Sequence, residues 1–404
     1  MLVLGELVID GAVLDSGLAF VMRAPNSYTG ENVVELQLHG SMPVLRAALD
    51  ALYRDGCRPA LAGEFTRRAF LNNKLDLSQA EAVNDLIHAE THDAARNAAG
   101  QLQGRVGRVF DELQAQLTEL LARFGVCVDY PDEDVPDVKS GDIIKTLDVI
   151  EQNLSELLES YAWGGILRTG LRCVILGKPN VGKSSIYNAL LGRDRALVTP
   201  HPGTTRDTLE ESVNLGGVLL RLADCAGVRE TDDPVEALGV ELAKRHAEEA
   251  ELLLVVVDGS QPLDGDDRAV LDLARDDKSI IIVNKSDLPQ KAETDVLEAA
   301  FLHICHLSAL TGDGIGQLDA ILRRMFDDRT LYDGSAISNP RQMDAIRRVL
   351  EACRAAGQAL RLKTTPDVVM CELESAMAAL SEVTGRSVSA DVLEKIFSEF
   401  CVGK

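Results

Sequence analysis

The stretch Gly177-Lys178-Pro179-Asn180-Val181-Gly182-Lys183-Ser184 decides the fold of the central part of this 404-residue chain. It fits the pattern GxxxxGK[ST], follows the strand-like run 172–176 and precedes helical sequence. Glycines let backbone N–H groups approach phosphates, and the start of the helix adds the positive end of its dipole. Lys183 then neutralises phosphate oxygens, and Ser184 offers a hydroxyl to Mg²⁺. An ordinary glycine-rich turn is the alternative, and the motifs that follow argue against it.

Three more motifs stand at or beyond the ends of strand-like runs. Asp224-Cys225-Ala226-Gly227 offers a carboxylate that can hold Mg²⁺ through water and a glycine N–H that can meet a γ-phosphate. Asn284-Lys285-Ser286-Asp287 ends on a carboxylate that can accept two N–H bonds from the edge of guanine, a pair that adenine lacks. Ser308-Ala309-Leu310 follows the last run. The sequence therefore predicts a GTP site.

Together these motifs resemble the G1, G3, G4 and G5 elements of the translation-factor-related GTPases. The stretch 203–207, GTTRD, occupies the place of switch I, where Thr205 is expected to give Mg²⁺ a second hydroxyl. Ras-like enzymes orient the attacking water with a Gln directly after the G3 glycine, but that position holds Val228, so another group must do it. The expected GTP contacts are Asn180, Val181, Gly182, Lys183, Ser184, Ser185, Thr199, Thr204, Thr205, Asp224, Gly227, Asn284, Lys285, Asp287, Ser308, Ala309 and Leu310.

Hydrophobic periodicity predicts the rest of the architecture. Short apolar runs that alternate with helical stretches indicate a parallel sheet with crossover helices, at 172–176, 218–222, 252–257, 279–283 and 303–307. Helical periodicity covers 75–121, 143–161, with an end near Trp163-Gly164-Gly165, 341–362, 368–383 and 390–400. Shorter runs at 2–9, 18–22 and 33–38 indicate a small α+β unit.

The expected fold is an α/β Ras-like P-loop G domain inserted into an α-helical domain, preceded by an α+β N-terminal domain. We place the N-terminal domain at 1–73, the G domain at 167–332, and the two helical halves at 74–166 and 333–404. No apolar run approaches the ~20 residues that a membrane helix needs, so no membrane partner is expected.

The composition is globular and acidic. The chain is 46% hydrophobic and 26% charged, and 41 basic against 64 acidic residues give a net charge of −23. This balance counts against a generic basic nucleic-acid binder. None of the eight cysteines forms a CxxC pair, which favours a reduced, cytoplasmic compartment.

Longer blocks carry a closer resemblance. GKPNVGKSS, GTTRD, DCAG, NKSD, the segment 70–77 (FLNNKLDL) and the terminal segment 400–404 (FCVGK) together resemble the tRNA modification GTPase family MnmE (TrmE). The likeness spans essentially the whole chain, and the FLNNKLDL and FCVGK blocks are the family-specific ones. It implies a homodimeric GTPase. With the FAD-dependent partner MnmG, such an enzyme drives the addition of a carboxymethylaminomethyl or aminomethyl group to C5 of the wobble uridine of certain tRNAs.

The resemblance also implies how hydrolysis works. In that family a K⁺ ion replaces the arginine finger, and pairing of two G domains completes the site. A fixed positive charge near the β/γ bridge stabilises the transition state, whatever its source. Carried over, Asn180 ligates K⁺, and Thr199, His201 and Thr204 lie in its binding loop. The residues expected to be catalytic are Glu236, which matches the glutamate proposed to orient the water, Thr205, Lys183 and Cys401.

The family's N-terminal domain resembles folate-binding aminomethyltransferases and takes a 5-formyl- or methylene-tetrahydrofolate. Glu35, Lys74 and Lys404 match its folate contacts, although without the resemblance they read as solvated surface charges. Family members begin several dozen residues earlier, with a strand that adds an arginine to this site. We therefore expect the start of the domain to be truncated and folate binding to be impaired. Cys401 is the family's redox or nucleophilic candidate, against the alternative of a small buried hydrophobe.

Other features carry weaker expectations. Cys225 stands where the family usually has Thr, and we expect GTPase activity to survive because that side chain is not a required ligand. His88 and His92 have a zinc-compatible i, i+4 spacing, but solvated histidines on a helix are the better interpretation. The segment 129–134 reads as an acidic turn.

Two other functions remain open. One is a GTP-dependent assembly factor of the Era or Der type acting on ribosomal RNA, although neither a basic segment with GxxG in the tail nor a second P-loop is found. The other is a folate-binding protein whose G domain only regulates it. The charge of −23 further predicts that the isolated subunit holds tRNA weakly.

Overall fold

The computed structural model describes residues 1–129, 140–192, 211–222, 245, 247–326, 334–401 and 403. Contacts between Cα atoms divide the chain into two compact units. The first comprises Met1–Ile87, Ala99–Leu157 and Arg341–Lys404, and the second comprises His88–Ala98 and Leu158–Pro340. Because the first unit joins the N-terminal and helical segments, it does not test the predicted limits at residues 73, 166 and 332, which remain our proposal.

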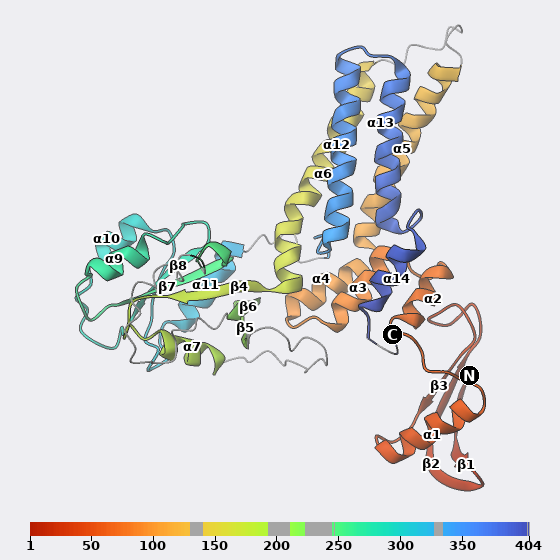
Figure 1. Ribbon diagram of the computed structural model, residues 1–404, viewed down its shortest axis with the longest axis horizontal. Helices are drawn as coiled ribbons and strands as arrows, with labels where there is room; N and C mark the ends of the chain where they lie inside the picture. Colours follow the sequence, from red (N-terminus) through yellow and green to blue (C-terminus); the bar gives the residue numbers. More distant parts are fainter. Residues whose placement is uncertain are drawn as a thin grey trace. The chain divides into compact units, whose positions relative to one another are not determined.

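The first unit begins with a three-stranded antiparallel sheet, whose strand order is β1-β2-β3 (Figure 1). The strands are β1 (Leu2–Ile9), β2 (Ala12–Met22) and β3 (Val33–Gln37), and helix α1 (Met42–Arg54) follows. Asp10 and Gly11 form the tight turn between β1 and β2 with φ angles of 50° and 80°. A two-residue Asp-Gly loop is a strong hairpin signal, since both residues tolerate positive φ.

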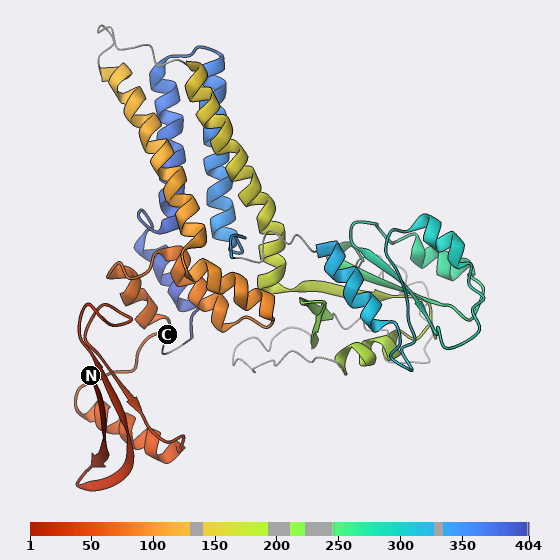
Figure 2. The ribbon, with the colours of Figure 1, turned by 180° about the vertical axis from the view of Figure 1, so that it is seen from behind.

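The rest of the first unit is helical. Its helices are α2 (Glu64–Leu71), α3 (Leu77–Ile87), the end of α4 (His92–Leu102), α5 (Arg105–Asp129), α6 (Ser140–Thr169) as far as Leu157, α12 (Pro340–Arg361), α13 (Pro366–Thr384) and α14 (Ala390–Ser398). Helices α5, α6, α12 and α13 run side by side (Figures 1 and 2). Each buries apolar residues three or four positions apart, as Leu113, Leu117 and Leu120 do on α5.

One helix prediction was wrong in detail. The region 75–121 is helical as predicted and contains three helices, separated at 88–91 and at 103–104, where Gly104 adopts a φ of 74°. The helix expected to end near Trp163-Gly164-Gly165 continues to Thr169. A Cβ added at Gly164 would lie only 2.0 Å from the carbonyl oxygen of Ile337. Gly164 therefore serves close packing against that backbone and does not end the helix.

The second unit is built on a six-stranded sheet with the order β5-β6-β4-β7-β8-β9. Its strands are β4 (Leu171–Leu176), β5 (Glu211–Leu215), β6 (Val218–Leu222), β7 (Leu252–Asp258), β8 (Ser279–Asn284) and β9 (Ile304–His306). All pairs are parallel except β5 with β6. The described helices of the inserted domain are α7 (Lys183–Leu191), α9 (Gly265–Leu271), α10 (Thr294–Ala300) and α11 (Ile315–Phe326).

The buried strand β7 shows how both faces of this sheet are covered. Leu252, Leu254 and Val256 pack into one apolar core, and the alternate residues Leu253, Val255 and Val257 pack into the other. A parallel sheet with helices on both faces buries its strands in this way, which explains their continuous apolar runs. The expected fold class is confirmed: an α/β Ras-like P-loop domain, a helical domain and an α+β N-terminal domain.

Strand β5 was not predicted. It forms an antiparallel hairpin with β6 through Gly216 and Gly217, whose φ angles are 66° and 88°. A Gly-Gly pair between two short apolar runs is a hairpin signal that could have found it. No helix in the described part of the chain is long and apolar enough to cross a membrane.

Candidate nucleotide-binding site

The P-loop connects the central strand β4 to helix α7. Strand β4 lies between β6 and β7, at the point where the strand order reverses, which is where open α/β sheets bind ligands. Asn180 and Gly182 adopt φ angles of 63° and 98°. A Cβ at Gly182 would lie 2.3 Å from Nδ2 of Asn284, and a Cβ at Gly177 would lie 2.6 Å from the carbonyl oxygen of Val256. The loop therefore needs both glycines to keep its curvature and its packing.

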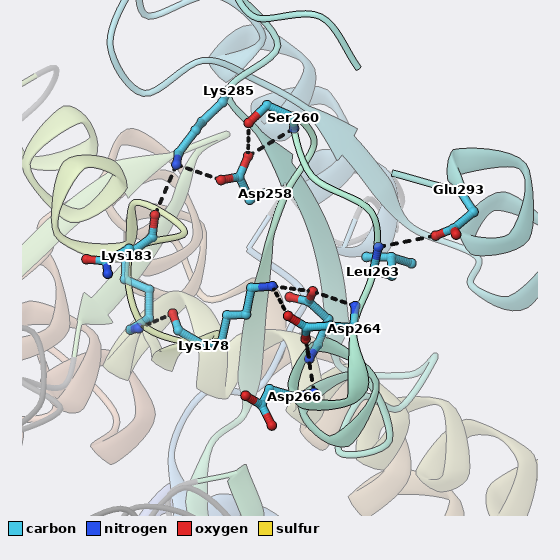
Figure 3. Close-up of polar contacts among 11 residues, drawn as sticks. Lys178, Lys183, Asp258, Ser260, Leu263, Asp264, Asp266, Lys285 and Glu293 are labelled. Atoms are coloured by element: carbon cyan, nitrogen blue, oxygen red, sulfur yellow. Dashed lines mark hydrogen bonds and ion pairs between the residues drawn. The ribbon is translucent and has the colours of Figure 1, made fainter. Parts of the chain in front are cut away.

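The Lys183 side chain is hydrogen-bonded to the P-loop, where it is expected to neutralise phosphate oxygens. Its Nζ donates to the carbonyl oxygens of Gly177 and Lys178, each at 2.8 Å (Figure 3). Ser184 follows in the first turn of α7 and is half-buried, whereas Ser185 is exposed. The ammonium and the Ser184 hydroxyl thus stand at the N-terminal end of a helix, where anions are stabilised.

Asn284 joins two of the predicted motifs to each other. It ends β8 and is only 2% exposed. Its Nδ2 donates to the carbonyl oxygen of Val181 at 2.8 Å, and its Oδ1 accepts from the N–H of Ala309 at 3.1 Å. One buried amide therefore fixes the P-loop and the loop after β9 relative to each other.

Lys285 connects the same loop to the end of β7. Its Nζ donates to the carbonyl oxygen of Asn180 at 3.0 Å and to Oδ2 of Asp258 at 2.6 Å (Figure 3). Burial alone would raise the pKa of Asp258, but the hydrogen bonds from Lys285 and Ser260 outweigh it and lower that pKa. Sequence reasoning missed Asp258 and Ser260. A carboxylate at the end of an apolar strand of a parallel sheet was the signal available.

Asp287 lies beside the loop after β9. The hydroxyl of Ser308 donates to Oδ1 of Asp287 at 2.6 Å, and the N–H of Thr311 donates to the Ser308 hydroxyl at 3.2 Å. Asp287 itself is exposed, and the Leu310 side chain is 85% exposed. The carboxylate is thus oriented by a fixed hydroxyl and remains open to a ligand.

The structure brings together the predicted residues of the P-loop, of NKSD and of the loop after β9. The other predicted residues lie outside the described part of the chain: Thr199, His201, Thr204, Thr205, Asp224, Gly227, Glu236 and Lys404, together with Cys225 and Val228. The same holds for residues 130–139, which contain most of the acidic turn.

The residues matched to folate contacts lie in the first unit. Glu35 is exposed on β3, opposite Phe20 of β2, and Lys74 Nζ donates to the carbonyl oxygen of Pro25 at 3.1 Å. Among the hydrogen bonds and ion pairs described, none joins Glu35 to Lys74. Cys401 is half-exposed, and its carbonyl oxygen accepts from the N–H of Gly63 at 3.3 Å.

The two histidines of the zinc alternative do not share a helix. Helix α3 ends at Ile87 and α4 begins at His92, so His88 lies in the break between them. His92 is exposed and His88 half-buried, and the described residues contain no group of three metal-ligating side chains. The expected helical i, i+4 pair was therefore wrong.

The parallel sheet, the P-loop between β4 and α7 and the motif order along the chain define a P-loop GTPase with a Ras-like G domain. Two family models match this chain: MnmE helical domain over residues 77–401 and GTP-binding protein TrmE N-terminus over residues 2–74. The chain belongs to the tRNA modification GTPase MnmE family.

Three relatives, each named tRNA modification GTPase MnmE, are similar to this chain over nearly its whole length. The protein of Heliobacterium modesticaldum is 42% identical over 405 residues, covering 98% of this chain and 87% of its own. That of Streptococcus thermophilus is 40% identical over 404 residues, covering 99% and 88%. That of Acetivibrio thermocellus is 38% identical over 399 residues, covering 98% and 87%. The expected family is confirmed, and with it a GTPase that takes part in tRNA modification.

Proposed function

We propose that this chain hydrolyses GTP with Mg²⁺ and K⁺ in the cytoplasm, as a homodimer whose G domains pair. With the FAD-dependent partner MnmG, its cycle would drive the addition of a carboxymethylaminomethyl or aminomethyl group to C5 of the wobble uridine of certain tRNAs. The observation that carries the nucleotide part is Asn284, which is buried between the P-loop and the loop after β9. The relatives' shared name supports the tRNA part.

The proposed roles follow the chemistry of each group. Asp287 accepts from guanine, backbone N–H groups of the P-loop hold the phosphates, and Lys183 neutralises them. Ser184 and Thr205 would hold Mg²⁺, which would supply positive charge to the phosphates. The remaining proposed contacts are those predicted from the sequence, including Asp224, Gly227 and Ser185. This set fits a magnesium nucleotide, because it combines hydroxyl and carboxylate oxygens with a positively charged loop.

Glu236 is the group that we propose to orient the attacking water, because Val228 has no polar atom on its side chain. We propose that K⁺ is held by Asn180, Thr199, His201 and Thr204. Its charge would stabilise the β/γ bridge in the transition state. Asn180 suits this role, since it is exposed and its amide oxygen can ligate a cation. Cys401 remains the candidate for redox or nucleophilic chemistry.

Glu35, Lys74 and Lys404 are proposed to bind a 5-formyl- or methylene-tetrahydrofolate. A carboxylate can accept from the pterin amine, and lysines can pair with the glutamate tail. The exposure of Glu35 and Lys74 leaves both available to a ligand. We propose further that the isolated subunit holds tRNA weakly, because a net charge of −23 opposes phosphate binding. A nanomolar, salt-sensitive affinity for tRNA would contradict this.

Comparison of tRNA nucleosides from a deletion strain and from wild type tests the proposed function. We expect the modified wobble uridine to be lost on deletion and restored by the intact gene, but not by Asn284→Ala. An unchanged wobble uridine in the deletion strain would reject the proposal. It would favour the rival, a ribosomal RNA assembly switch of the Era or Der type.

Turnover in KCl and NaCl at matched ionic strength tests the K⁺ assignment. We expect faster GTP hydrolysis in KCl, because Val228 and the exposed Asn180 favour a cation in place of an arginine finger. Equal rates in the two salts would contradict it.

The Glu236→Ala variant tests the water-orienting role. Nucleotide affinity should stay within about threefold of wild type while hydrolysis falls by about a hundredfold or more, the range that general acid–base groups contribute. Weakened GTP binding with normal turnover would reject the assignment.

A further inference from the structure

Lys178 is the second residue of the P-loop, at a position where the GxxxxGK[ST] pattern accepts any residue. In the structure its side chain is nevertheless fixed by two ion pairs. Its Nζ lies 2.7 Å from Oδ2 of Asp264 and 2.7 Å from Oδ2 of Asp267 (Figure 3). The Lys178 side chain is 17% exposed, Asp267 is 3% exposed and Asp264 is 55% exposed. This arrangement, the Lys178 clamp, connects the P-loop to the start of α9.

The two carboxylates are fixed independently of Lys178. Asp264 is the N-cap of α9, and its Oδ1 accepts from the N–H groups of Asp266 at 3.1 Å and Asp267 at 3.0 Å. In return, Oδ2 of Asp267 accepts from the N–H of Asp264 at 3.2 Å. This reciprocal capping box orders both side chains, and the buried Leu271 holds α9 against the sheet. The lysine therefore meets a preorganised anionic pair on a rigid element.

The backbone of Lys178 faces the phosphate-binding lysine. Its carbonyl oxygen accepts from Lys183 Nζ at 2.8 Å, beside the equivalent bond to Gly177. Lys178 thus contacts α9 through its side chain and Lys183 through its main chain. One residue thus connects the start of α9 to the Lys183 ammonium.

We propose that Lys178 is a positioning residue for GTP hydrolysis: its ion pairs with Asp264 and Asp267 hold the first half of the P-loop in register with Lys183. In this role the Lys178 clamp acts through the backbone of the P-loop and through Lys183. Reactions that depend on electrostatic stabilisation are sensitive to such shifts, because misplacement of a charged group by about 1 Å can cost two orders of magnitude in rate.

Two groups of the clamp, Lys178 and Asp264, have pKa values that favour their charged forms. Burial lowers the pKa of Lys178, but its hydrogen bonds to Asp264 and Asp267 more than compensate and leave that pKa raised. The hydrogen bond from Lys178 is the main cause that lowers the pKa of Asp264 to about 2. Lys178 and Asp264 therefore both stay ionised near neutral pH.

The test uses the full chain, with steady-state hydrolysis, single-turnover hydrolysis at saturating GTP, and thermal unfolding without nucleotide. Lys178→Met keeps the length of the side chain and removes its charge. We expect its single-turnover rate to fall about tenfold or more, and kcat/KM to fall further. Lys178→Arg, which can still pair with both carboxylates, should recover most of the loss.

Lys278→Met is the matched control. Lys278 is a half-buried lysine directly before β8, at the opposite end of that strand from Asn284, and its Nζ donates to the carbonyl oxygens of Ala247 and Ala250. Its loss should lower thermal stability about as much as Lys178→Met and leave the single-turnover rate within about twofold of wild type. An equal rate loss in Lys278→Met would show general destabilisation and overturn the proposal.

Asp264→Asn keeps the test decisive if Lys178→Met does not fold. The amide oxygen can still cap α9, while the amide nitrogen replaces the oxygen that accepts from Lys178, so this change removes one charge and one acceptor of the clamp. We expect a threefold to tenfold lower single-turnover rate. A wild-type rate and KM in whichever of these variants folds would overturn the proposal, as would a Lys178→Arg variant no better than Lys178→Met.

Discussion

The nucleotide-binding loops and the helical domain each bury a polar side chain, but they satisfy it differently. Asn284 bonds to main-chain groups, the carbonyl of Val181 and the N–H of Ala309. Glu81, which is 5% exposed on α3, accepts side-chain donors from α12: Arg341 at 2.7 and 2.9 Å and Gln342 at 2.8 Å. Main-chain partners exist wherever the backbone passes, whereas an ion pair exists only where two helices bring the right residues together. The loops are therefore specified by short motifs, and the helical domain by distant pairing.

The Asn284→Ala variant should give the largest effect. It leaves two main-chain groups without partners at about 1–3 kcal/mol each and frees the two loops from each other, so GTP affinity should fall about a thousandfold, or about 4 kcal/mol. Titration with a fluorescent GTP analogue measures it. The control is Gln290→Ala, whose exposed Nε2 also donates to two carbonyl oxygens nearby, Lys285 and Leu288, and which should lose less than tenfold. Similar losses in both would remove the distinction that we draw for Asn284.

The Glu81→Ala variant tests the buried ion pair of the helical domain. It leaves the partly buried Arg341 without its buried carboxylate partner, and breaking such a pair costs about 3 kcal/mol of unfolding free energy. Denaturant unfolding followed by circular dichroism measures that loss. GDP affinity should stay within about twofold of wild type, because Glu81 belongs to the other compact unit. A large drop in GDP affinity with unchanged stability would contradict this separation of roles.

The Asp287→Asn variant sharpens the assignment of the base. The new amide loses one acceptor toward guanine and gains a donor, so GDP affinity should fall about thirtyfold, or about 2 kcal/mol. Xanthosine diphosphate, which carries a carbonyl in place of the exocyclic amine, should bind better to the variant than to wild type. Competition against a labelled nucleotide measures both. Unchanged preference for guanine would place the base-reading group elsewhere.

The Arg361→Ala variant should give the smallest effect. Arg361 pairs with Asp148 at 2.7 Å, but both side chains are more than half exposed, and such pairs contribute about 0–1 kcal/mol. Its unfolding free energy in the same denaturant assay should stay within about 1 kcal/mol of wild type. A loss as large as that of Glu81→Ala would show that burial does not separate the two ion pairs.

Most of the fold was predictable from the sequence, because strands and helices each have a characteristic spacing of apolar residues. The parallel strands appear as apolar runs, and the long helices repeat apolar residues every three or four positions. The prediction was wrong or incomplete where the end of a helix depends on packing against residues that are distant in the sequence. Gly164 continues a helix because it packs against Ile337, and Gly104 helps to separate two helices within one periodic stretch.

The same contrast holds within the candidate site. Lys183, Asn284 and Asp287 were predictable because each belongs to a short motif at the end of a strand. Asp258 and the Lys178 clamp were not, because their partners come from different loops that only the folded sheet brings together. The Asp264-Gly265-Asp266-Asp267 stretch signals a capping box, but nothing local shows that a P-loop lysine binds it.

Nucleotide competition on the full chain tests whether the site selects guanine nucleotides and depends on Asn284. Labelled GDP is displaced by unlabelled GTP, GDP, ATP or ADP in the presence of Mg²⁺. We expect GTP and GDP to displace the label at least a hundredfold more effectively than ATP and ADP, and we expect Asn284→Ala to abolish tight binding of the label. Equal displacement by adenine and guanine nucleotides, or wild-type binding by Asn284→Ala, would contradict it.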